Sequence, residues 1–335
     1  MNKPKVTAED FTDFLVATPV NATVMEEQRT SPVGSDESSH DGCRLLHRLD
    51  PSRDAVWLEV KAEVCLTSGG LILDDTVLDK PHARKIDCVH HIWSGKHYAD
   101  IKGIDLLTLL WTDGERHLLC GYRIYDKPND GKTINNHFGD LIDTAKAYDS
   151  SQNTCFLHGF YSSLLNLRKI DTVGWRWVTR LKQNRRFYPA RARNRPVGDW
   201  DIATTGTVVH LENYNMVKVF RIISKDGTAE HWATNDLEMD KLGRWKIEEY
   251  HRGLKQVTNV KSCQCWKAHV QRSHIGLART AFLVFDRYCF RTGYNWVATK
   301  AKIFQEAVRL SGQTLGSGVT WQMNNSYNCE VKNYL

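Results

Sequence analysis

Four charged residues fall along one face of a predicted helix. The stretch GRWKIEEYHRGLKQ (residues 243–256) spaces them at i, i+4, i+8 and i+11: Arg244, Glu248, Arg252 and Lys255. At 3.6 residues per turn these positions share one face, so a single carboxylate lies among three cations. Such a face is either an exposed helix with weak ion pairs or a site for cutting nucleic acid. In the second case Glu248 helps to hold a divalent cation while the cations fix phosphate groups.

A histidine ends a short apolar strand earlier in the chain. The stretch CFLHGFYSS (155–163) predicts a strand that stops at His158, turns at Gly159 and enters a helix. In mixed α/β folds the residue at such a strand end often points into the active site. His158 is therefore a catalytic base, a metal ligand or a replacement for another residue.

Two adjacent acids end another apolar strand. The stretch GLILDD (70–75) has the composition of a buried strand and finishes with Asp74 and Asp75. Because neighbouring residues on a strand face opposite sides, we expect only one of the two to point to a shared site.

A basic segment, residues 176–196, contains no Asp or Glu and is named the arginine-rich segment here. Its cations are Arg176, Arg180, Lys182, Arg185, Arg186, Arg191, Arg193 and Arg195. Aromatic residues are interleaved with them, namely Trp175, Trp177, Phe187 and Tyr188. Cations neutralise phosphates and aromatic rings stack on exposed bases, so the segment predicts contact with nucleic acid.

Composition narrows the class of protein. The chain has 335 residues and a net charge of +6, which suits two or three soluble domains. It lacks an apolar run of the roughly 18–20 residues that a membrane helix needs, and its start lacks the apolar region of a secretory signal. We therefore expect a cytosolic protein without membrane contact. The cysteines are scattered, which favours free thiols over a zinc site or disulfides.

The order of predicted elements indicates a mixed α/β fold. Residues 1–65 are helical in pattern, with a capping box formed by Thr7 and Asp10. Strands follow at 70–75, 87–93, 104–111 and 116–126, then a helix at 134–149, the strand before His158, a helix and the strand RWVTRLK. Residues 200–235 are β-rich, a long helix begins near Asp240, and another covers 266–292. Antiparallel strands followed by helix and strand in alternation are typical of a ribonuclease-H-like sheet.

Several of these stretches together resemble a known family. Arg244, Glu248 and Lys255 match R-x3-E-x6-K, which is part of the YREK signature of DDE-type bacterial insertion-sequence transposases. The Tyr of that signature is replaced by Lys241. LILDDTVLDKPHARKI, GFYSSLLNLRKIDTVGWRWVTRLKQNR, IEEYHRGLKQ and RSHIGLARTAF also resemble this family, and the resemblance runs from about residue 5 to 310.

The resemblance implies an α/β fold in which a ribonuclease-H-like mixed sheet has flanking helices, a β-rich insertion and an N-terminal helical domain. The implied divisions are 1–65 for DNA recognition, 66–195 for the first part of the catalytic core, 196–236 for the insertion, 237–312 for the C-terminal core helices and 313–335 for a disordered tail. The implied partners are double-stranded DNA, both the element's terminal inverted repeats and the target, and a second copy in a homodimer on DNA. The implied location is the bacterial cytosol, in association with the nucleoid.

The resemblance also implies the site. Three acids would hold two Mg²⁺ (or Mn²⁺) ions, one activating the nucleophile and the other stabilising the leaving oxygen. Glu248 is the third acid, and Asp75, which precedes Thr76 as in the family's DT pair, is favoured over Asp74 as the first. The metal ligands would thus be Asp75 and Glu248. The implied DNA contacts are Arg244, Arg252, Lys255, Arg180, Lys182, Arg185 and Arg186.

His158 occupies the place of the second catalytic Asp, since relatives have DSWYSS where this chain has HGFYSS. An imidazole offers one nitrogen, whereas Mg²⁺ prefers oxygen ligands. The first hypothesis is a transposase whose two-metal cleavage and strand transfer are impaired. The alternative is a catalytically inactive DNA-binding remnant. A third possibility is a zinc or manganese site formed by His158 with Asp75 and Glu248.

Overall fold

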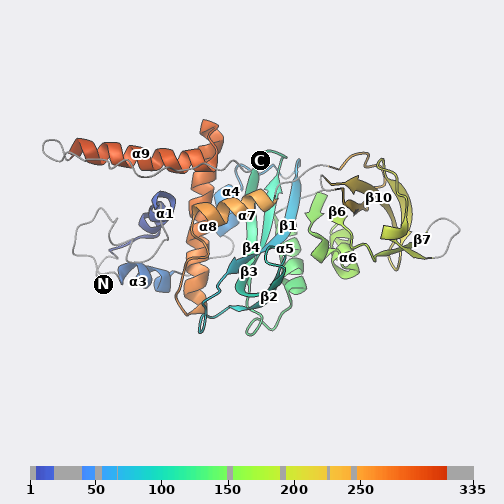
Figure 1. The fold of residues 1–335 in the computed structure, drawn as a ribbon, viewed down its shortest axis with the longest axis horizontal. Helices are drawn as coiled ribbons and strands as arrows, with labels where there is room; N and C mark the ends of the chain where they lie inside the picture. Colours follow the sequence, from blue (N-terminus) through green and yellow to red (C-terminus); the bar gives the residue numbers. More distant parts are fainter. Residues whose placement is uncertain are drawn as a thin grey trace.

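The computed structural model describes residues 5–18, 40–49, 55–65, 67–148, 154–188, 194–224, 227–242 and 247–314. Figure 1 shows an elongated molecule with a mixed sheet at its centre. Helices α1, α3, α8 and α9 lie at one end, and a β-rich block lies at the other (Figure 1).

The central strands have the predicted mixed order. Their bounds are β1 Gly70–Asp79, β2 His90–Ser94, β3 Ala99–Thr112, β4 His117–Tyr125, β5 Thr154–Leu157 and β6 Arg176–Arg180. Strand β3 is antiparallel to β1, β2 and β4, whereas β5 is parallel to β1 and β6 is parallel to β5. The order β4-β3-β1-β5-β6 results. One expected strand is shorter than predicted, because the chain turns at Cys88 with φ +66° before β2 begins.

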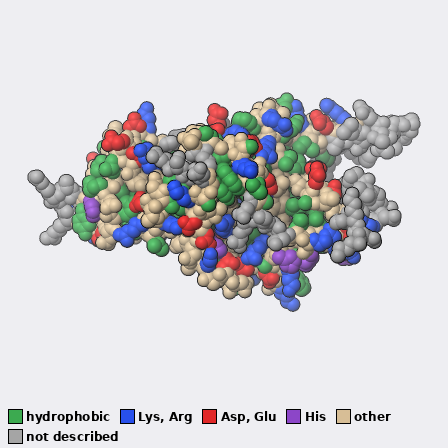
Figure 2. Space-filling view, turned by 180° about the vertical axis from the view of Figure 1, so that it is seen from behind, with side chains coloured by type: hydrophobic (Ala, Val, Ile, Leu, Met, Phe, Trp, Pro, Cys, Tyr) green, Lys and Arg blue, Asp and Glu red, His purple; other side chains and the backbone are tan. Residues whose placement is uncertain are grey.

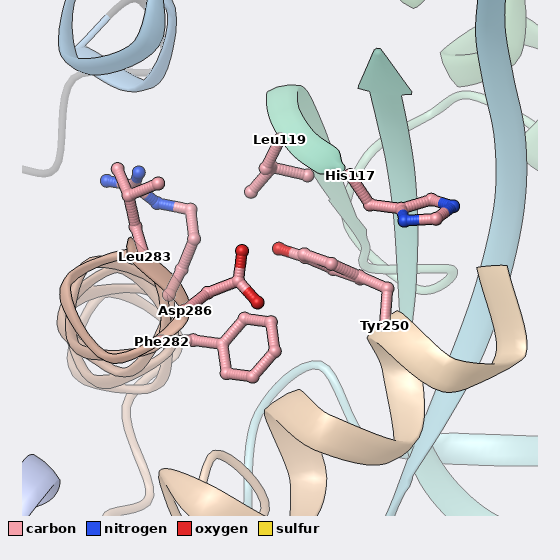
Figure 3. A pocket seen from close by; sticks show the side chains of 7 residues that line it. His117, Leu119, Tyr250, Phe282, Leu283 and Asp286 are labelled. Atoms are coloured by element: carbon pink, nitrogen blue, oxygen red, sulfur yellow. The ribbon is translucent and has the colours of Figure 1, made fainter. Parts of the chain in front are cut away.

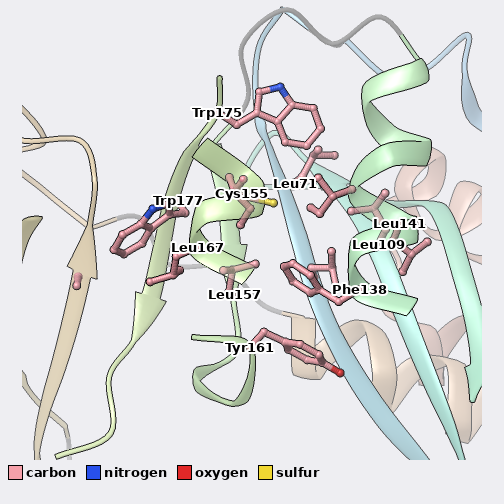
Figure 4. Packing of buried hydrophobic residues seen from close by; sticks show 14 of the residues in the cluster. Leu71, Leu109, Phe138, Leu141, Cys155, Leu157, Tyr161, Leu167, Trp175 and Trp177 are labelled. Atoms are coloured by element: carbon pink, nitrogen blue, oxygen red, sulfur yellow. The ribbon is translucent and has the colours of Figure 1, made fainter. Parts of the chain in front are cut away.

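Strand β1 is buried on both faces, because helices cover the sheet on both sides. Leu71 and Leu73 belong to one hydrophobic cluster with Phe138 of α5 (Ile134–Ala147) and Leu167 of α6 (Leu164–Thr172). Figure 4 shows Leu71, Phe138 and Leu167 among the residues of this cluster. Ile72 points the other way and joins the cluster of α7 (Ile247–Val257) and α8 (Ala268–Thr292). This alternation continues past Leu73 and sets the directions of the two acids that follow.

The β-rich block continues the same sheet. Its strands are β7 Arg186–Tyr188, β8 Arg195–Pro196, β9 Thr207–Leu211, β10 Met216–Ile223 and β11 Ala229–Thr234. Strand β11 pairs antiparallel with β6, which joins the block to the central strands. Because β7 already pairs with β9, the block begins earlier in the chain than residue 196.

The N-terminal helices pack on the long helix α8. They are α1 (Ala8–Ala17), α3 (Asp41–Arg48) and α4 (Ala55–Val60). The predicted capping box of α1 is confirmed, because Thr7 and Asp10 bond each other's backbone N–H groups. Phe11, Leu15 and Leu46 share one hydrophobic cluster with Phe282 of α8. These helices therefore have no separate core, and their role in DNA recognition stays a prediction.

The C-terminal part adds a helix that the sequence pattern did not predict. The helix predicted at 266–292 is confirmed as α8, and α9 (Trp296–Thr314) follows it after a turn at Gly293. Residues 313 and 314 belong to α9, and the rest of the predicted tail lies outside the described residues. Among the helices in the described part of the chain, none is long and apolar enough to cross a membrane. The described cysteines are all free, as expected.

Candidate active site

Asp74 and His158 come together because their strands are parallel neighbours. Leu73 of β1 is in register with Leu157 of β5, so the next residues, Asp74 and His158, face the same side of the sheet. The Nδ1 atom of His158 lies 3.8 Å from Oδ1 of Asp74, and 56% of the His158 side chain is exposed. The end of the predicted strand therefore places His158 beside Asp74, one of the two adjacent acids at positions 74 and 75.

Asp74 is a buried carboxyl group in a negatively charged setting. Burial raises its pKa well above the ordinary value, and the charges of Asp75 and Glu248 raise it further. The backbone N–H of Asp75 donates to Asp74 Oδ1 at 2.9 Å, which acts in the opposite direction. Glu248 thus lies within electrostatic range of Asp74, although it is far away in the sequence.

Asp75 points to the opposite face of β1. Its Oδ1 accepts a hydrogen bond of 2.8 Å from the hydroxyl of Tyr161, and Tyr161 belongs to the hydrophobic cluster beneath α5 and α6. Figure 4 shows Tyr161 beneath Phe138 beside β1. Strand alternation turns the Asp75 carboxylate away from the side where Asp74 meets His158, so this geometry favours Asp74, and the predicted role of Asp75 as first acid stays untested.

Asp105 is a further buried acid that the sequence analysis missed. It lies on β3 opposite Val77, on the same face as Asp75, and only 5% of it is exposed. Burial, and then the charge and hydrogen bond of Asp75, raise the pKa of Asp105 well above its ordinary value. Its other oxygen, Oδ1, has no hydrogen-bond partner among the described residues. An acid inside the apolar run GIDLLTLLW was the signal that could have identified it.

Helix α7 carries Glu248 on an exposed face and packs its other face on the sheet. Its buried residues include Ile247, Tyr250 and Leu254, and His251 Nε2 lies 2.9 Å from the Thr108 hydroxyl on β3. A Cβ atom at Gly253 would come within 2.7 Å of the Trp296 ring, so glycine allows α9 to approach α7 closely.

A small pocket marks the joint between α7, α8 and β4. It is lined by His117, Leu119, Tyr250, Arg279, Phe282, Leu283 and Asp286. Tyr250 and Asp286 point toward one another across it (Figure 3). The lining includes neither Asp74 nor Glu248, so this pocket is separate from the candidate active site.

The predicted cations of α7 differ in exposure. Arg252 is exposed and Lys255 is half-buried, whereas Arg244 lies outside the described residues. Burial lowers the pKa of Lys255, and the carboxylate of Asp79 opposes that effect. The match to the YREK signature therefore remains a prediction where it depends on Arg244.

The arginine-rich segment is used largely inside the fold. Arg180 pairs with Glu230 at 3.0 Å, and the guanidinium of half-buried Arg185 donates to the backbone carbonyl of Ser162. Lys182 and Arg186 are exposed. Of the four predicted DNA contacts in this segment, two thus have protein partners already.

The donor set does not match a two-ion magnesium site. Asp74 and Glu248 supply carboxylates, but the residue that follows β5 beside Asp74 is His158. Its imidazole cannot bridge two Mg²⁺ ions. Within the described ranges, no three His, Cys, Asp or Glu side chains are arranged so that they could hold a metal ion. The metal ligands predicted from the sequence, Asp75 and Glu248, and the alternative metal site with His158 both stay predictions.

The central sheet, in which β1 is antiparallel to β3 and parallel to β5, has the ribonuclease-H-like fold that the sequence predicted. The sequence model of the transposase DDE domain matches residues 67–284. The chain therefore belongs to the family of DDE-domain transposases, whose members use divalent metal ions and act in DNA recombination by mobile elements. No curated protein sequence matches the chain.

A solved transposase structure has a similar fold. A piggyBac transposase synaptic complex with hairpin DNA is similar with a TM-score of 0.50 and 10% identity, over 98% of this chain and 78% of that chain. At this identity the likeness concerns the fold alone. An Argonaute from Marinitoga piezophila, in complex with guide RNA and target DNA, is 11% identical over 63% of this chain and 30% of that one, with a TM-score of 0.25. That weaker likeness carries no argument.

Proposed function

We propose that the chain is a DNA transposase of an insertion sequence whose cleavage of DNA is impaired because His158 stands where the second catalytic Asp belongs. One observation carries the proposal. In a DDE-domain chain, the side chain that follows β5 and lies 3.8 Å from the Asp74 carboxylate is an imidazole.

We assign the first acid to Asp74 and the third to Glu248. The assignment rests on their shared side of the sheet and on the effect of Glu248 on the pKa of Asp74. Asp75 instead helps to hold β1 through Tyr161 and Asp105.

The His158 side chain weakens this site in two ways. An aspartate at position 158 adds a negative charge that attracts divalent cations, and neutral imidazole adds none. A carboxylate also offers two oxygen atoms, which suit Mg²⁺, whereas imidazole offers one nitrogen that suits later transition metals. Binding of DNA depends on cations elsewhere and is expected to survive.

The decisive experiment is Mg²⁺-dependent nicking of a duplex that carries the element's terminal inverted repeats. His158→Asp is expected to increase the nicking rate about tenfold or more, because it restores a hard oxygen ligand. His158→Asn is the matched control, because the asparagine side chain has nearly the same shape as aspartate but carries no charge. Robust activity that is equal in the unaltered protein and in His158→Asp contradicts the proposal.

The same assay tests the choice between the two adjacent acids. In the His158→Asp background, Asp74→Asn is expected to abolish nicking. Asp75→Asn is expected to retain part of the nicking and to lower stability. The reverse pattern would return the first-acid role to Asp75.

The second candidate is a DNA-binding remnant that does not cleave. Lys241 in place of the signature Tyr and His158 in place of Asp both favour it. A gel shift with the same duplex is expected to show binding in either case. Binding by both proteins without nicking by His158→Asp would select the remnant. Nicking with Mn²⁺ or Zn²⁺ that depends on His158 itself would select the imidazole metal site instead.

The proposed partners are duplex DNA at the element's ends and at the target, and a second copy of the chain. The similar piggyBac structure is described as a synaptic complex with hairpin DNA, which supports DNA as the partner. Joining two element ends requires two active sites, so we propose that a homodimer binds DNA in the bacterial cytosol.

A further inference from the structure

The hairpin between β2 and β3 presents aromatic side chains to solvent. Trp93 on β2 is 63% exposed and Tyr98 in the connecting turn is 83% exposed. Tyr98 has a φ of +48°, a left-handed conformation that is an outlier for a bulky residue. Both rings are thus largely exposed to solvent, and the strained backbone of Tyr98 carries an exposed side chain.

The segment before α8 adds a third exposed ring beside the loop that leads into this hairpin. Trp266 is 62% exposed, and its backbone carbonyl accepts a hydrogen bond from the N–H of Asp87. The ammonium of Lys85 lies 5.5 Å from the Trp266 ring centre, a cation–π contact. Lys96 in the hairpin turn is exposed. We name Lys85, Trp93, Lys96, Tyr98 and Trp266 the hairpin surface.

The hairpin surface adjoins the candidate active site through the end of β1. Asp79, the last residue of β1, lies 4.0 Å from Lys96 Nζ and 3.4 Å from His97 Nε2. On α7, the charges of both Asp79 and Lys96 affect the pKa of Lys255. Glu248 and Lys255 are seven residues apart on α7, which corresponds to about 10 Å along a helix axis. The exposed side of α7 therefore connects Glu248 to the hairpin.

Charge and shape together identify the kind of partner. Figure 2 shows acidic and basic side chains intermixed over one face of the molecule. The positive net charge is therefore not gathered on that face into one continuous basic surface for DNA. The hairpin surface contains two exposed cations, Lys85 and Lys96, and three exposed rings. Cations bind phosphates, and rings stack on bases only where the bases are unpaired.

We propose that the hairpin surface binds an unpaired segment of the DNA strand that leaves the active site along α7. The rings of Trp93 and Tyr98 stack on bases, and Lys85 and Lys96 contact the flanking phosphates. This inference rests on the proposed function, because it assumes that DNA is the substrate of the site.

Fluorescence anisotropy with two labelled probes tests the inference. One probe is a single-stranded oligo-dT and the other is a blunt duplex. The double variant Trp93→Ala with Tyr98→Ala is expected to bind oligo-dT about tenfold more weakly, the scale of a lost base stack, with less than about a twofold change for the duplex. Trp93→Phe with Tyr98→Phe keeps both rings and is expected to restore most of the affinity.

Phe304→Ala is the matched control, because Phe304 is an exposed aromatic residue (52%) on the distant helix α9. It is expected to leave binding to both probes unchanged, and thermal melting confirms that each variant is folded. Equal losses on both probes, or no loss on oligo-dT, overturn the hairpin inference while DNA binding stands. If the Trp93→Ala with Tyr98→Ala variant changes from dimer to monomer without losing affinity for DNA, the hairpin surface binds a second copy of the chain instead, and the inference is overturned. If the unaltered protein binds neither probe, the proposed function fails as well.

Discussion

Two basic regions with aromatic residues differ in how the fold uses them. In the arginine-rich segment, three of the six described cations bond within the protein: Arg176 pairs with Asp236 at 2.9 Å, Arg180 with Glu230, and Arg185 with a backbone carbonyl. Its Trp177 is fully buried, and the Trp177 indole N–H donates to the Tyr214 hydroxyl. This segment is mainly a structural joint between the central strands and the β-rich block.

The hairpin surface shows the opposite use of similar residues. Its rings are exposed, Lys85 contacts a ring, and Lys96 remains 74% exposed although it lies 4.0 Å from the Asp79 carboxylate. The sequence drew attention to the first region because the density of arginine there is high. A high density of arginine in the sequence shows only that many cations are present. The exposure of their side chains decides whether those cations can contact a partner.

The largest effect is expected at Arg185. Arg185→Ala should lower the free energy of unfolding by about 2 kcal/mol, because it removes a charged hydrogen bond and leaves the carbonyl of Ser162 without its donor. Denaturant titration measures the change. The exposed neighbour Arg186→Ala is the control and is expected to change stability by less than about 0.5 kcal/mol. Equal effects of the two variants would contradict the structural role of Arg185.

A smaller effect is expected from the cations of the hairpin surface. Lys85→Gln with Lys96→Gln should weaken oligo-dT binding about tenfold and reduce the slope of log affinity against log salt by about 1.4, or about 0.7 for each lost phosphate contact. Stability should remain unchanged, since both side chains are exposed. An unchanged salt slope would show that these lysines do not contact phosphate.

The exposed cations of the arginine-rich segment are expected to contribute less. Lys182→Gln with Arg186→Gln should weaken binding of a blunt duplex about threefold and leave oligo-dT binding almost unchanged. The same anisotropy titration measures both. A loss larger than that of the lysine pair would restore the arginine-rich segment as the principal DNA contact and reverse the comparison.

The smallest effect is expected at Arg180. Its ion pair with Glu230 is partly exposed, 48% and 22% for the two side chains, and pairs of this kind contribute about 0–1 kcal/mol. A double-mutant cycle with Arg180→Ala and Glu230→Ala should give a coupling energy below about 1 kcal/mol. A larger coupling would mean that the segment depends on this pair as well as on Arg185.

Much of the fold could be predicted because the chain shows regular local patterns. The capping box at Thr7, the helices now seen as α5 and α8, and the strand that ends before His158 all follow from local spacing. The join between β6 and β11 could not be predicted, because strand pairing between distant segments leaves no local pattern in either one.

The site was predictable in part for the same reason. Alternation along β1 shows that Asp74 and Asp75 face opposite sides, but not which side meets α7. That choice depends on the register between Leu73 and Leu157, and on the approach of Glu248 from a helix that is remote in the sequence. Asp105 was missed because its partner Asp75 lies on another strand.

The sequence by itself determined that a strand ends just before His158 and that Glu248 lies on an amphipathic helix. Both are consequences of backbone periodicity, which acts over a few residues. Tertiary structure alone decided that Asp74, not Asp75, faces His158, and that the hairpin's rings are exposed while Trp177 is buried. Burial and charge proximity are set by segments that meet only after folding, so neither can be read from local spacing.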